Sequence, residues 1–342
     1  MKTRLLGMNP DELRQIALSE GLPGFTGKQL ARWIYVKKVR TLAEMTDIPL
    51  SGRERLGEKY EVGVTPYVDC QVSSDGTKKY LFPVSGAGNA VESVMIPEAD
   101  RKTLCVSSQA GCKMGCRFCM TGRQGFHGNL SAAEILSQFL AVDESDDLTN
   151  AVFMGMGEPL DNWDNVSRAI EVLTAPWGFA WSPKRITLST IGVIPNLRKY
   201  LESSRCHLAV SLHNPFPDER LGMMPVQKAW PVSEVVSLIR RYDFTGQRRV
   251  SFEYTMFSGV NDDKVHADAL YRLLRGLECR VNLIRFHKIP DSPLEPSPAP
   301  VMQRFMERLN NHGITCTIRA SRGEDIYAAC GLLAGKHKEK EN

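Results

Sequence analysis

Residues 103–119 read TLCVSSQAGCKMGCRFC, and this stretch decides the fold. Its first half is rich in apolar and β-branched residues, which predicts a strand covered on both faces. Its second half spaces Cys112, Cys116 and Cys119 as Cys-x3-Cys-x2-Cys, with no fourth cysteine close behind. Thiolates are the usual ligands of iron–sulfur clusters, and a four-iron cluster takes four ligands. Three ligands from one short loop therefore predict a cluster with one iron open to a chelating small molecule.

A zinc knuckle or a redox-active cysteine cluster is the alternative interpretation of this loop. A structural zinc ion takes four protein ligands, and no His or Cys stands at finger spacing from the three cysteines. The amine and carboxylate of S-adenosylmethionine (SAM) could chelate the open iron. The loop thus resembles that of radical SAM enzymes, in which the reduced cluster cleaves SAM to a 5′-deoxyadenosyl radical.

Downstream of this stretch, apolar runs alternate with amphipathic helical runs. Such alternation indicates right-handed βαβ units and a parallel sheet. Six candidate strands are too few for a closed eight-stranded barrel, so we expect an α/β fold with a partial (βα)6 barrel over residues 99–322. A further helix and strand near residue 315 could extend the sheet. The candidate strands cover residues 103–109, 150–157, 185–190, 207–213, 250–257 and 281–287.

Three segments flank the predicted barrel. Residues 1–64 have helical patterns, beginning with a capping Asn9 before Pro10. Residues 65–98 are predicted to form a short β extension, because a turn signal at Asp75 separates extended runs. Residues 323–342 form a C-terminal segment that contains Cys330.

The composition is that of an ordinary globular protein. The 342 residues are 42% hydrophobic and 24% charged, and the net charge of +4 permits a nucleic-acid partner without arguing for one. The first residues lack the apolar core of a signal peptide, and no stretch is apolar enough to span a membrane. We therefore expect a cytoplasmic protein with no membrane partner. In that reducing compartment clustered cysteines bind metal or do chemistry rather than form structural disulfides.

Polar residues stand where the predicted strands end, which is the edge where parallel barrels gather functional groups. Glycines there let a ligand approach the backbone, and Glu158 could accept a hydrogen bond from an ammonium group. Each such residue alone is more often a turn or cap residue. The candidates are Gly157, Glu158, Ser189, Ser211, Leu212, His213 and His287. The cysteines outside the loop are by default small buried hydrophobes; they are Cys70, Cys105, Cys206, Cys279, Cys316 and Cys330.

From about residue 20 to residue 335 the chain resembles the RlmN/Cfr family of radical SAM RNA adenine methyltransferases. Long motifs in a fixed order carry the resemblance, and together they are highly specific. They are VESVMIPE (91–98), residues 103–126, MGMGEPLDN (154–162), ITLSTIGVIP (186–195), LAVSLHNP (208–215) and SRGEDIYAACG (321–331). The intact GMGEPLDN is more similar to the RlmN branch, which methylates adenine C2, than to the Cfr branch.

The resemblance implies a two-stage reaction on adenine C2 in the peptidyl transferase region of 23S rRNA and in tRNA anticodon loops. One SAM methylates Cys330, and a second SAM at the cluster is cleaved to the radical that activates this methyl group for addition to C2. Glu92 matches the family's proton acceptor. Cys105 matches the cysteine that attacks the Cys330 sulfur, forming a disulfide and freeing the methylated base.

The resemblance also implies that the strand-end candidates bind SAM. Two positions depart from the family pattern: His287 stands where Asn is common, and Leu332 where Gln is common. Both His and Asn can hydrogen-bond an adenine edge. A [4Fe–4S] cluster, two SAM per turnover, an electron donor such as flavodoxin, an RNA-binding N-terminal domain and a monomer are further implied. Adenine C8 methylation of the Cfr type and a non-enzymatic metal-binding RNA module remain open as alternatives.

Overall fold

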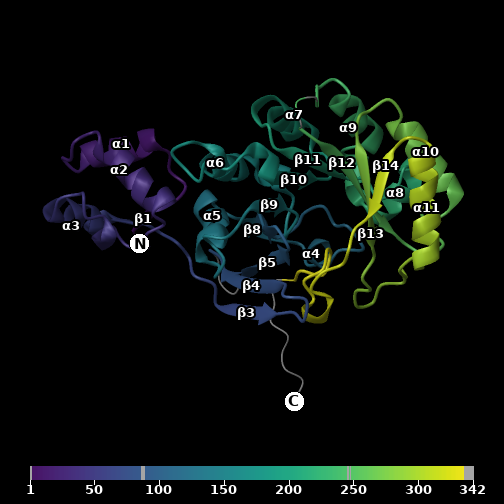
Figure 1. Cartoon of the computed structure of the whole chain (residues 1–342), viewed down its shortest axis with the longest axis horizontal. Coiled ribbons are helices and arrows are strands. Elements are labelled where there is room, and N and C mark those ends of the chain that lie inside the picture. Colours follow the sequence, from purple (N-terminus) through teal and green to yellow (C-terminus); the bar gives the residue numbers. More distant parts are fainter. Residues whose placement is uncertain (1, 86–88, 245, 247, 335–342) are drawn as a thin grey trace, which may run out of the picture.

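The computed structural model describes residues 2–85, 89–244, 246 and 248–334. Its body is a ten-stranded sheet covered by helices, and the N-terminal elements form a separate lobe at the left of the view (Figure 1). The strand order is β14-β13-β12-β11-β10-β9-β6-β5-β4-β3. Strands β6 and β9 to β14 are parallel, whereas β3, β4 and β5 join antiparallel.

The partial barrel predicted from the sequence is confirmed. Its strands are β6 (Arg101–Cys105), β9 (Asn150–Phe153), β10 (Ile186–Thr190), β11 (His207–Ser211), β12 (Val250–Met256) and β13 (Arg280–Arg285). The expected extension is also present, because β14 (Thr315–Ile318) pairs in parallel with β13.

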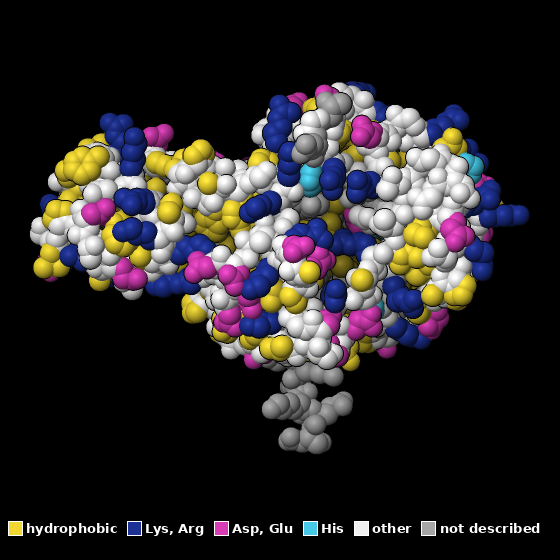
Figure 2. Space-filling model, viewed as in Figure 1, with side chains coloured by type: hydrophobic (Ala, Val, Ile, Leu, Met, Phe, Trp, Pro, Cys, Tyr) yellow, Lys and Arg dark blue, Asp and Glu magenta, His cyan; other side chains and the backbone are white. Residues whose placement is uncertain are grey.

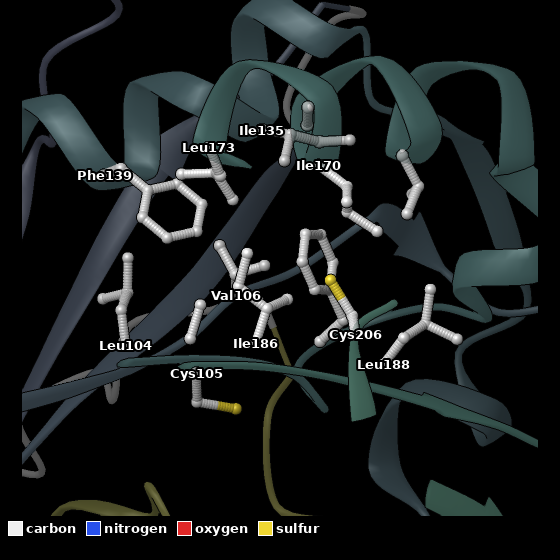
Figure 3. Close-up of a cluster of buried hydrophobic side chains, with 14 of the residues drawn as sticks. Leu104, Cys105, Val106, Ile135, Phe139, Ile170, Leu173, Ile186, Leu188 and Cys206 are labelled. Carbon is white, nitrogen blue, oxygen red and sulfur yellow. The ribbon is translucent and has the colours of Figure 1, made fainter. Parts of the chain in front are cut away.

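Helices follow the strands and cover one side of the sheet (Figure 1). Apolar residues recur on each helix at helical spacing and pack on the strands. In Figure 3, Ile135, Phe139 and Leu173 from two of these helices meet Leu104 and Ile186 from the sheet. The helices are α5 (Ala132–Ala141), α6 (Trp163–Thr174), α7 (Ile194–Ser203), α8 (Pro217–Met223), α9 (Val232–Ile239), α10 (Lys264–Leu274) and α11 (Ala299–Asn311).

The N-terminal lobe is helical as predicted. Asn9 caps α1, because its side chain accepts hydrogen bonds from the N–H groups of Asp11 and Glu12. An ion pair between Arg168 and Glu12 joins the lobe to the barrel. The lobe's helices are α1 (Pro10–Ser19), α2 (Thr26–Ala31), a π-helical turn η1 (Arg32–Val36), a 3-10 turn η2 (Leu42–Glu44) and α3 (Leu50–Lys59). The short parallel strands β1 (Thr3–Arg4) and β2 (Tyr60–Glu61) were not predicted.

The β extension continues the main sheet rather than standing apart. Its strands are β3 (Asp69–Val72), β4 (Lys78–Pro83) and β5 (Ala90–Glu98), and β5 pairs with β6. The first predicted barrel strand is shorter than expected, because β6 ends at Cys105 and Gln109–Gly111 forms β7, which pairs with β8 (Phe126–Asn129) in a separate ribbon. The remaining short elements are α4 (Met120–Arg123), η3 (Pro159–Asn162), η4 (Pro183–Arg185), η5 (Pro225–Lys228) and η6 (Glu324–Ile326).

Within the part of the chain that is described, no helix is both long and apolar enough to cross a bilayer. All nine cysteines are free thiols. Residues 335–342 of the predicted C-terminal segment lie outside the described residues.

Candidate functional site

The cysteine loop is held by the β7–β8 ribbon at one end and by α4 at the other. The Cys112 N–H donates to the Gly125 carbonyl oxygen at 2.8 Å, and the Cys119 carbonyl accepts from Arg123 at 3.0 Å in α4. Gly111 has a φ of +71°, and a Cβ there would lie 1.9 Å from the Gly125 oxygen. The backbone conformation that starts the loop therefore requires glycine.

Protein surrounds the three thiols of this loop, and they influence one another. Burial raises the pKa of Cys112 to about 12 and that of Cys119 as well, and neighbouring thiols add to the effect at Cys112. Burial raises the pKa of Cys116 too, and Cys119 and Cys112 act in the same direction. Such thiols need a strong positive charge to become thiolates, and cluster iron supplies it.

The donor set fits a multi-iron cluster better than a single ion. In the described ranges no group of three or more His, Cys, Asp or Glu side chains is close enough to hold one metal ion. A four-iron cluster spaces its thiolates more widely than a zinc ion does. Three thiols on one loop, with no fourth cysteine close behind them in the sequence, suit such a cluster and leave one iron for a small-molecule ligand.

The turn after β9 brings Gly157 and Glu158 against this loop. Gly157 has a φ of +98°, and a Cβ there would lie 2.5 Å from the Cβ of Gln109. Glu158 is buried, and it accepts hydrogen bonds from the Thr190 hydroxyl at 2.5 Å and the Ile191 N–H at 3.0 Å. Burial raises the pKa of Glu158 to about 7, although these hydrogen bonds oppose the shift. The Glu158 carboxylate also raises the pKa of the Cys112 thiol, so it acts electrostatically on the predicted cluster site.

The turn after β11 also reaches the cysteine loop. His213 is buried with a φ of +57°, and its ring lies edge-on to Phe118 at 5.0 Å between centroids. Its Nδ1 accepts the Thr255 N–H at 3.0 Å, and burial lowers its pKa to about 3, so the ring is neutral. The Leu212 side chain packs in the core, and Ser211 is half-buried at the end of β11.

The other two strand-end candidates lie on the barrel interior. Ser189 is half-buried, and it lies on the same face of β10 as Thr187, which lines the main cavity. His287 also lines this cavity, but its contacts are with the C-terminal segment: Nε2 lies 3.0 Å from the Ser321 hydroxyl, and Nδ1 lies 4.0 Å from Glu324. Within the described residues, the polar contacts of His287 are thus with residues 321–324 and not with the other members of the predicted SAM set.

That cavity has a volume of about 530 Å³ and runs through the barrel interior. Cys330 lines its inner part. Basic side chains gather around a hollow on the face seen in Figure 2. Those that line the cavity at the N-terminal ends of the strands are Arg101, Lys184, Arg185, Arg249 and Arg280. The sequence pattern did not indicate this basic mouth, because its residues are scattered along the chain and only the fold brings them together.

Cys105 and Cys330 approach each other although they are far apart in sequence. In Figure 3 the Cys105 side chain points away from the packed cluster into which its neighbours Leu104 and Val106 point. Burial raises the pKa of Cys105 to about 12, and the Cys330 thiol acts in the same direction. Cys330 reaches solvent through the cavity, yet the protein around it raises its pKa, with Cys119 contributing. The Cys330 thiol therefore interacts electrostatically both with Cys105 and with Cys119 of the cysteine loop.

An ion pair that the sequence did not indicate stands beside these two sulfurs. Arg319 Nη1 lies 3.6 Å from the buried Oε2 of Glu253 on β12 and 3.6 Å from the sulfur of Met154. The positive charge of Arg319 opposes the raised pKa values of both Cys105 and Cys330. Arg319 thus favours the thiolate form of each sulfur. A charged residue inside the apolar run of β12 is the one sequence signal that could have found this pair.

Both carboxylate oxygens of Glu92 on β5, and its backbone carbonyl oxygen, have polar partners. Its Oε1 lies 3.0 Å from the ammonium of Lys79 on β4, and both side chains are buried. Its Oε2 accepts the Ala334 N–H at 2.6 Å, and its carbonyl oxygen accepts the Ser107 hydroxyl at 2.6 Å. A carboxylate paired in this way is fixed in orientation.

The C-terminal segment packs on α4, directly after the cysteine loop, and we call its residues 331–334 the strap. Gly331 accepts the Met120 N–H at 2.9 Å, Leu333 accepts the Thr121 hydroxyl at 2.8 Å, and Ala334 accepts the Gln124 amide at 2.8 Å. All three donors belong to α4 or follow it directly. The strap, residues 331–334, therefore fixes Cys330 relative to the loop and, through Ala334, relative to Glu92.

Comparison with known proteins places this arrangement in a family. The radical SAM superfamily profile matches residues 106–271, and the profile of the ribosomal RNA large subunit methyltransferase N-terminal domain matches residues 3–62. A probable dual-specificity RNA methyltransferase RlmN of Porphyromonas gingivalis is 61% identical over 338 residues, which cover 99% of this chain and 96% of the relative. A protein of the same description from Parabacteroides distasonis is 57% identical and covers 97% of each chain.

A solved structure agrees. The crystal structure of a radical SAM methyltransferase from Sphaerobacter thermophilus superposes with a TM-score of 0.92 at 36% identity, over 98% of this chain and 100% of that one. Radical SAM membership implies a [4Fe–4S] cluster and SAM, and it excludes the non-enzymatic metal-binding module. The chain belongs to the RlmN family of dual-specificity RNA methyltransferases, within the radical SAM superfamily.

Proposed function

We propose that this enzyme methylates C2 of an adenine in the peptidyl transferase region of 23S rRNA and in tRNA anticodon loops, through an S-methylcysteine at Cys330. One observation carries the proposal: Cys330 lines the cavity, and its thiol interacts electrostatically with Cys105 and with Cys119 of the cysteine loop. A direct transfer from SAM to RNA would need neither cysteine. Adenine C2 is electron-poor and a weak nucleophile, which is why a carrier sulfur is useful.

Each residue then has a chemical task. When bound, the cluster and SAM supply a methyl cation equivalent and a carbon radical, from two SAM molecules per turnover. Cys330 accepts the methyl group on sulfur, loses one hydrogen atom from it, and presents the carbon to C2. Glu92, fixed by Lys79, accepts the proton from C2. The adduct must also give up one electron, which the cluster oxidised by SAM cleavage would accept. The Cys105 thiolate then attacks the Cys330 sulfur, and the S–C bond breaks as the S–S bond forms. The electron pair of the broken bond stays on the carbon joined to C2, and this carbon takes up a proton to become the methyl group.

SAM recognition follows from the turns beside the cysteine loop. We propose that Glu158 accepts from the SAM amino group and that the glycine before it lets the ligand reach the backbone. His213 is neutral, so it can accept as well as donate a hydrogen bond. The proposed set is Gly157, Glu158, Ser189, Ser211, Leu212, His213 and His287.

RNA would approach through the basic mouth of the cavity. Eight Lys and Arg side chains line the cavity against two carboxylates, which suits a phosphate backbone. The N-terminal lobe offers a second contact, because Phe25 is 64% exposed and the Lys37 ammonium lies 3.2 Å from the Trp33 ring centroid. Unstacked loop bases are recognised by such aromatic and cationic groups. We infer four segments, residues 1–64, 65–98, 99–322 and 323–342, in a cytoplasmic monomer served by a flavodoxin-type electron donor.

The test is a map of modified adenines. RNA from cells that lack the gene, and from the same cells complemented with wild type or with Cys330→Ala, is digested and its nucleosides are separated by mass spectrometry. We expect 2-methyladenosine in 23S rRNA and tRNA with wild type only. 8-Methyladenosine instead would assign the Cfr reaction, and full methylation by Cys330→Ala would remove the carrier role.

A further inference from the structure

Arg220 on α8 is the most deeply buried basic side chain of the site region, with 0% exposure. All its hydrogen bonds go to neutral acceptors. Nε donates to the Leu212 carbonyl at 2.9 Å, Nη2 to the Ser211 carbonyl at 3.0 Å, and Nη1 to Gln227 Oε1 at 2.6 Å. Among the described residues no carboxylate forms an ion pair with this guanidinium.

The guanidinium nevertheless stays charged at neutral pH. Burial lowers the pKa of Arg220 to about 10, which is still well above neutral. The two carbonyls that it binds directly precede His213, whose ring lies 5.0 Å from that of Phe118 in the cysteine loop. Arg220 is therefore held against the turn after β11, and this turn contacts the loop.

The packing agrees with this placement. The Arg117 N–H of the cysteine loop donates to the carbonyl of Met223, the last residue of α8, at 3.0 Å. Phe118 packs in one apolar cluster with Met223 and Met224. The end of α8 and the loop are therefore one packed unit, with Arg220 on its inner side.

A buried cation without an anion is costly, and proteins usually pair such charges. Lys79 illustrates the pairing, because its buried ammonium has Glu92 beside it. Arg220 has only dipoles as partners within the protein. Three thiolates bound to iron form an anionic group, and this group would complete the pair.

We propose that Arg220 is the fixed countercharge of the iron–sulfur cluster, and that it raises the cluster's reduction potential by stabilising the reduced state. Reduction adds one electron from a low-potential donor, so it makes the cluster more negative. A nearby fixed cation favours that state over the oxidised one, and the low local dielectric strengthens the effect. The inference rests on the cluster that the family implies and not on which adenine carbon is methylated.

The experiment measures the potential directly. Anaerobically reconstituted protein is titrated with dithionite in the absence of SAM, and the EPR signal of the reduced cluster gives the midpoint. We expect Arg220→Gln to shift the midpoint to more negative values. Arg220→Lys keeps the charge but loses the hydrogen-bond geometry, and it should remain near wild type.

Two further variants separate charge from folding. Gln227→Glu has the same shape and places a carboxylate on Arg220 Nη1, so it should fold, neutralise the charge locally and shift the midpoint to more negative values. Arg248→Gln removes another buried arginine, which donates to the Cys206 and Leu201 carbonyls at 3.1 and 3.2 Å, and it should leave the midpoint unchanged.

Each variant has a midpoint potential that would contradict the proposed role of Arg220. An iron-loaded Arg220→Gln with the wild-type midpoint would overturn the proposal. If that variant takes up no iron, a wild-type midpoint in Gln227→Glu would overturn it instead. An Arg220→Lys midpoint as negative as that of Arg220→Gln would assign the residue a purely geometric role. RNA methylation is not measured, so failure here leaves the C2 proposal standing.

Discussion

The residue that best separates mechanism from packing is Cys105. Removing its thiol should cost stability by about 1 kcal/mol or less, because the side chain is small. If Cys105 resolves the covalent adduct, Cys105→Ala starts the reaction and then stalls with RNA attached to Cys330. Denaturing electrophoresis of protein from cells should then show a slow, nuclease-sensitive band.

Cys206→Ala is the matched control, because Cys206 is also buried but its side chain lies among the packed side chains of Figure 3, whereas that of Cys105 points away from them. It should give free protein and normal methylation. Cys105→Ala that behaves in the same way would return Cys105 to a packing role.

Breaking the buried pair of Lys79 and Glu92 should lower the free energy of unfolding. Lys79→Met leaves the Glu92 carboxylate without its ammonium partner, which should cost about 3–5 kcal/mol of unfolding free energy. Urea unfolding of cluster-free protein, followed by circular dichroism, measures this. Lys102→Met breaks an exposed pair with Asp147 and should cost less than about 1 kcal/mol. Equal losses of unfolding free energy in the two variants would contradict the description of Lys79 and Glu92 as a buried ion pair.

His213 predicts a pH dependence. Because burial lowers its pKa to about 3, the folded ring stays neutral while the unfolded ring, with a pKa near 6.5, takes up a proton below that value. Its contribution to stability is full above about pH 6.5 and is lost as the pH falls toward 3. Between pH 7.5 and 5.5 the cluster-free wild type should therefore lose about 1 kcal/mol more than His213→Gln in urea unfolding. If the unfolding free energies of wild type and His213→Gln changed with pH in parallel, the folded ring would take up its proton as readily as the unfolded one, and its pKa would not be lowered.

At the scale of elements, the β7–β8 ribbon decides whether the cysteine loop can form. A Cβ at Gly111 would lie 1.9 Å from the Gly125 carbonyl oxygen, and the residue has a φ of +71°. Gly111→Ala should therefore lower the iron content after reconstitution while the barrel remains folded. Gly128→Ala, in the same ribbon, meets no atom within 4 Å and should load iron normally. The readings are iron per chain and the visible absorbance of the cluster.

The β7–β8 ribbon is also an example of an element that sequence patterns do not predict. The barrel strands were predictable because their apolar runs are local. The ribbon was not, because β7 and β8 pair across the whole cysteine loop and Phe126–Asn129 reads as a polar loop. The π-helical turn η1 was hidden for another reason: Leu30, Trp33 and Ile34 also fit an ordinary helix.

Site residues divide in the same way. The cysteine loop and the strand-end turns were predicted from spacing and position, and Glu92, Cys105 and Cys330 from a family resemblance. Lys79, Arg220 and Arg319 were missed, because each takes its role from a partner on another element. No local pattern distinguishes a buried cation from a solvated one. The basic mouth was missed because its members come from the starts of four separate strands.

At the scale of the whole molecule, charge rather than shape should govern RNA binding. Arg249→Gln and Arg280→Gln, at the cavity mouth, should weaken binding of an anticodon stem-loop and reduce the slope of log affinity against log salt by about 1 per lost phosphate contact. Fluorescence anisotropy at several salt concentrations measures both. Arg308→Gln, on the outer helix α11 where Arg308 pairs with Asp268, should leave the slope unchanged. A slope unchanged in the mouth variants would place the RNA elsewhere.

The strap over the cysteine loop has a consequence for how the enzyme is made. Residues 331–334 leave the ribosome after every part of the barrel, and domains fold in the order in which they emerge. While the strap is still in the exit tunnel, α4 lacks the three acceptors that it later holds. The cysteine loop is therefore held by the β7–β8 ribbon and α4 before the strap packs on it, and the Cys330 sulfur is the last group of the site to reach its place.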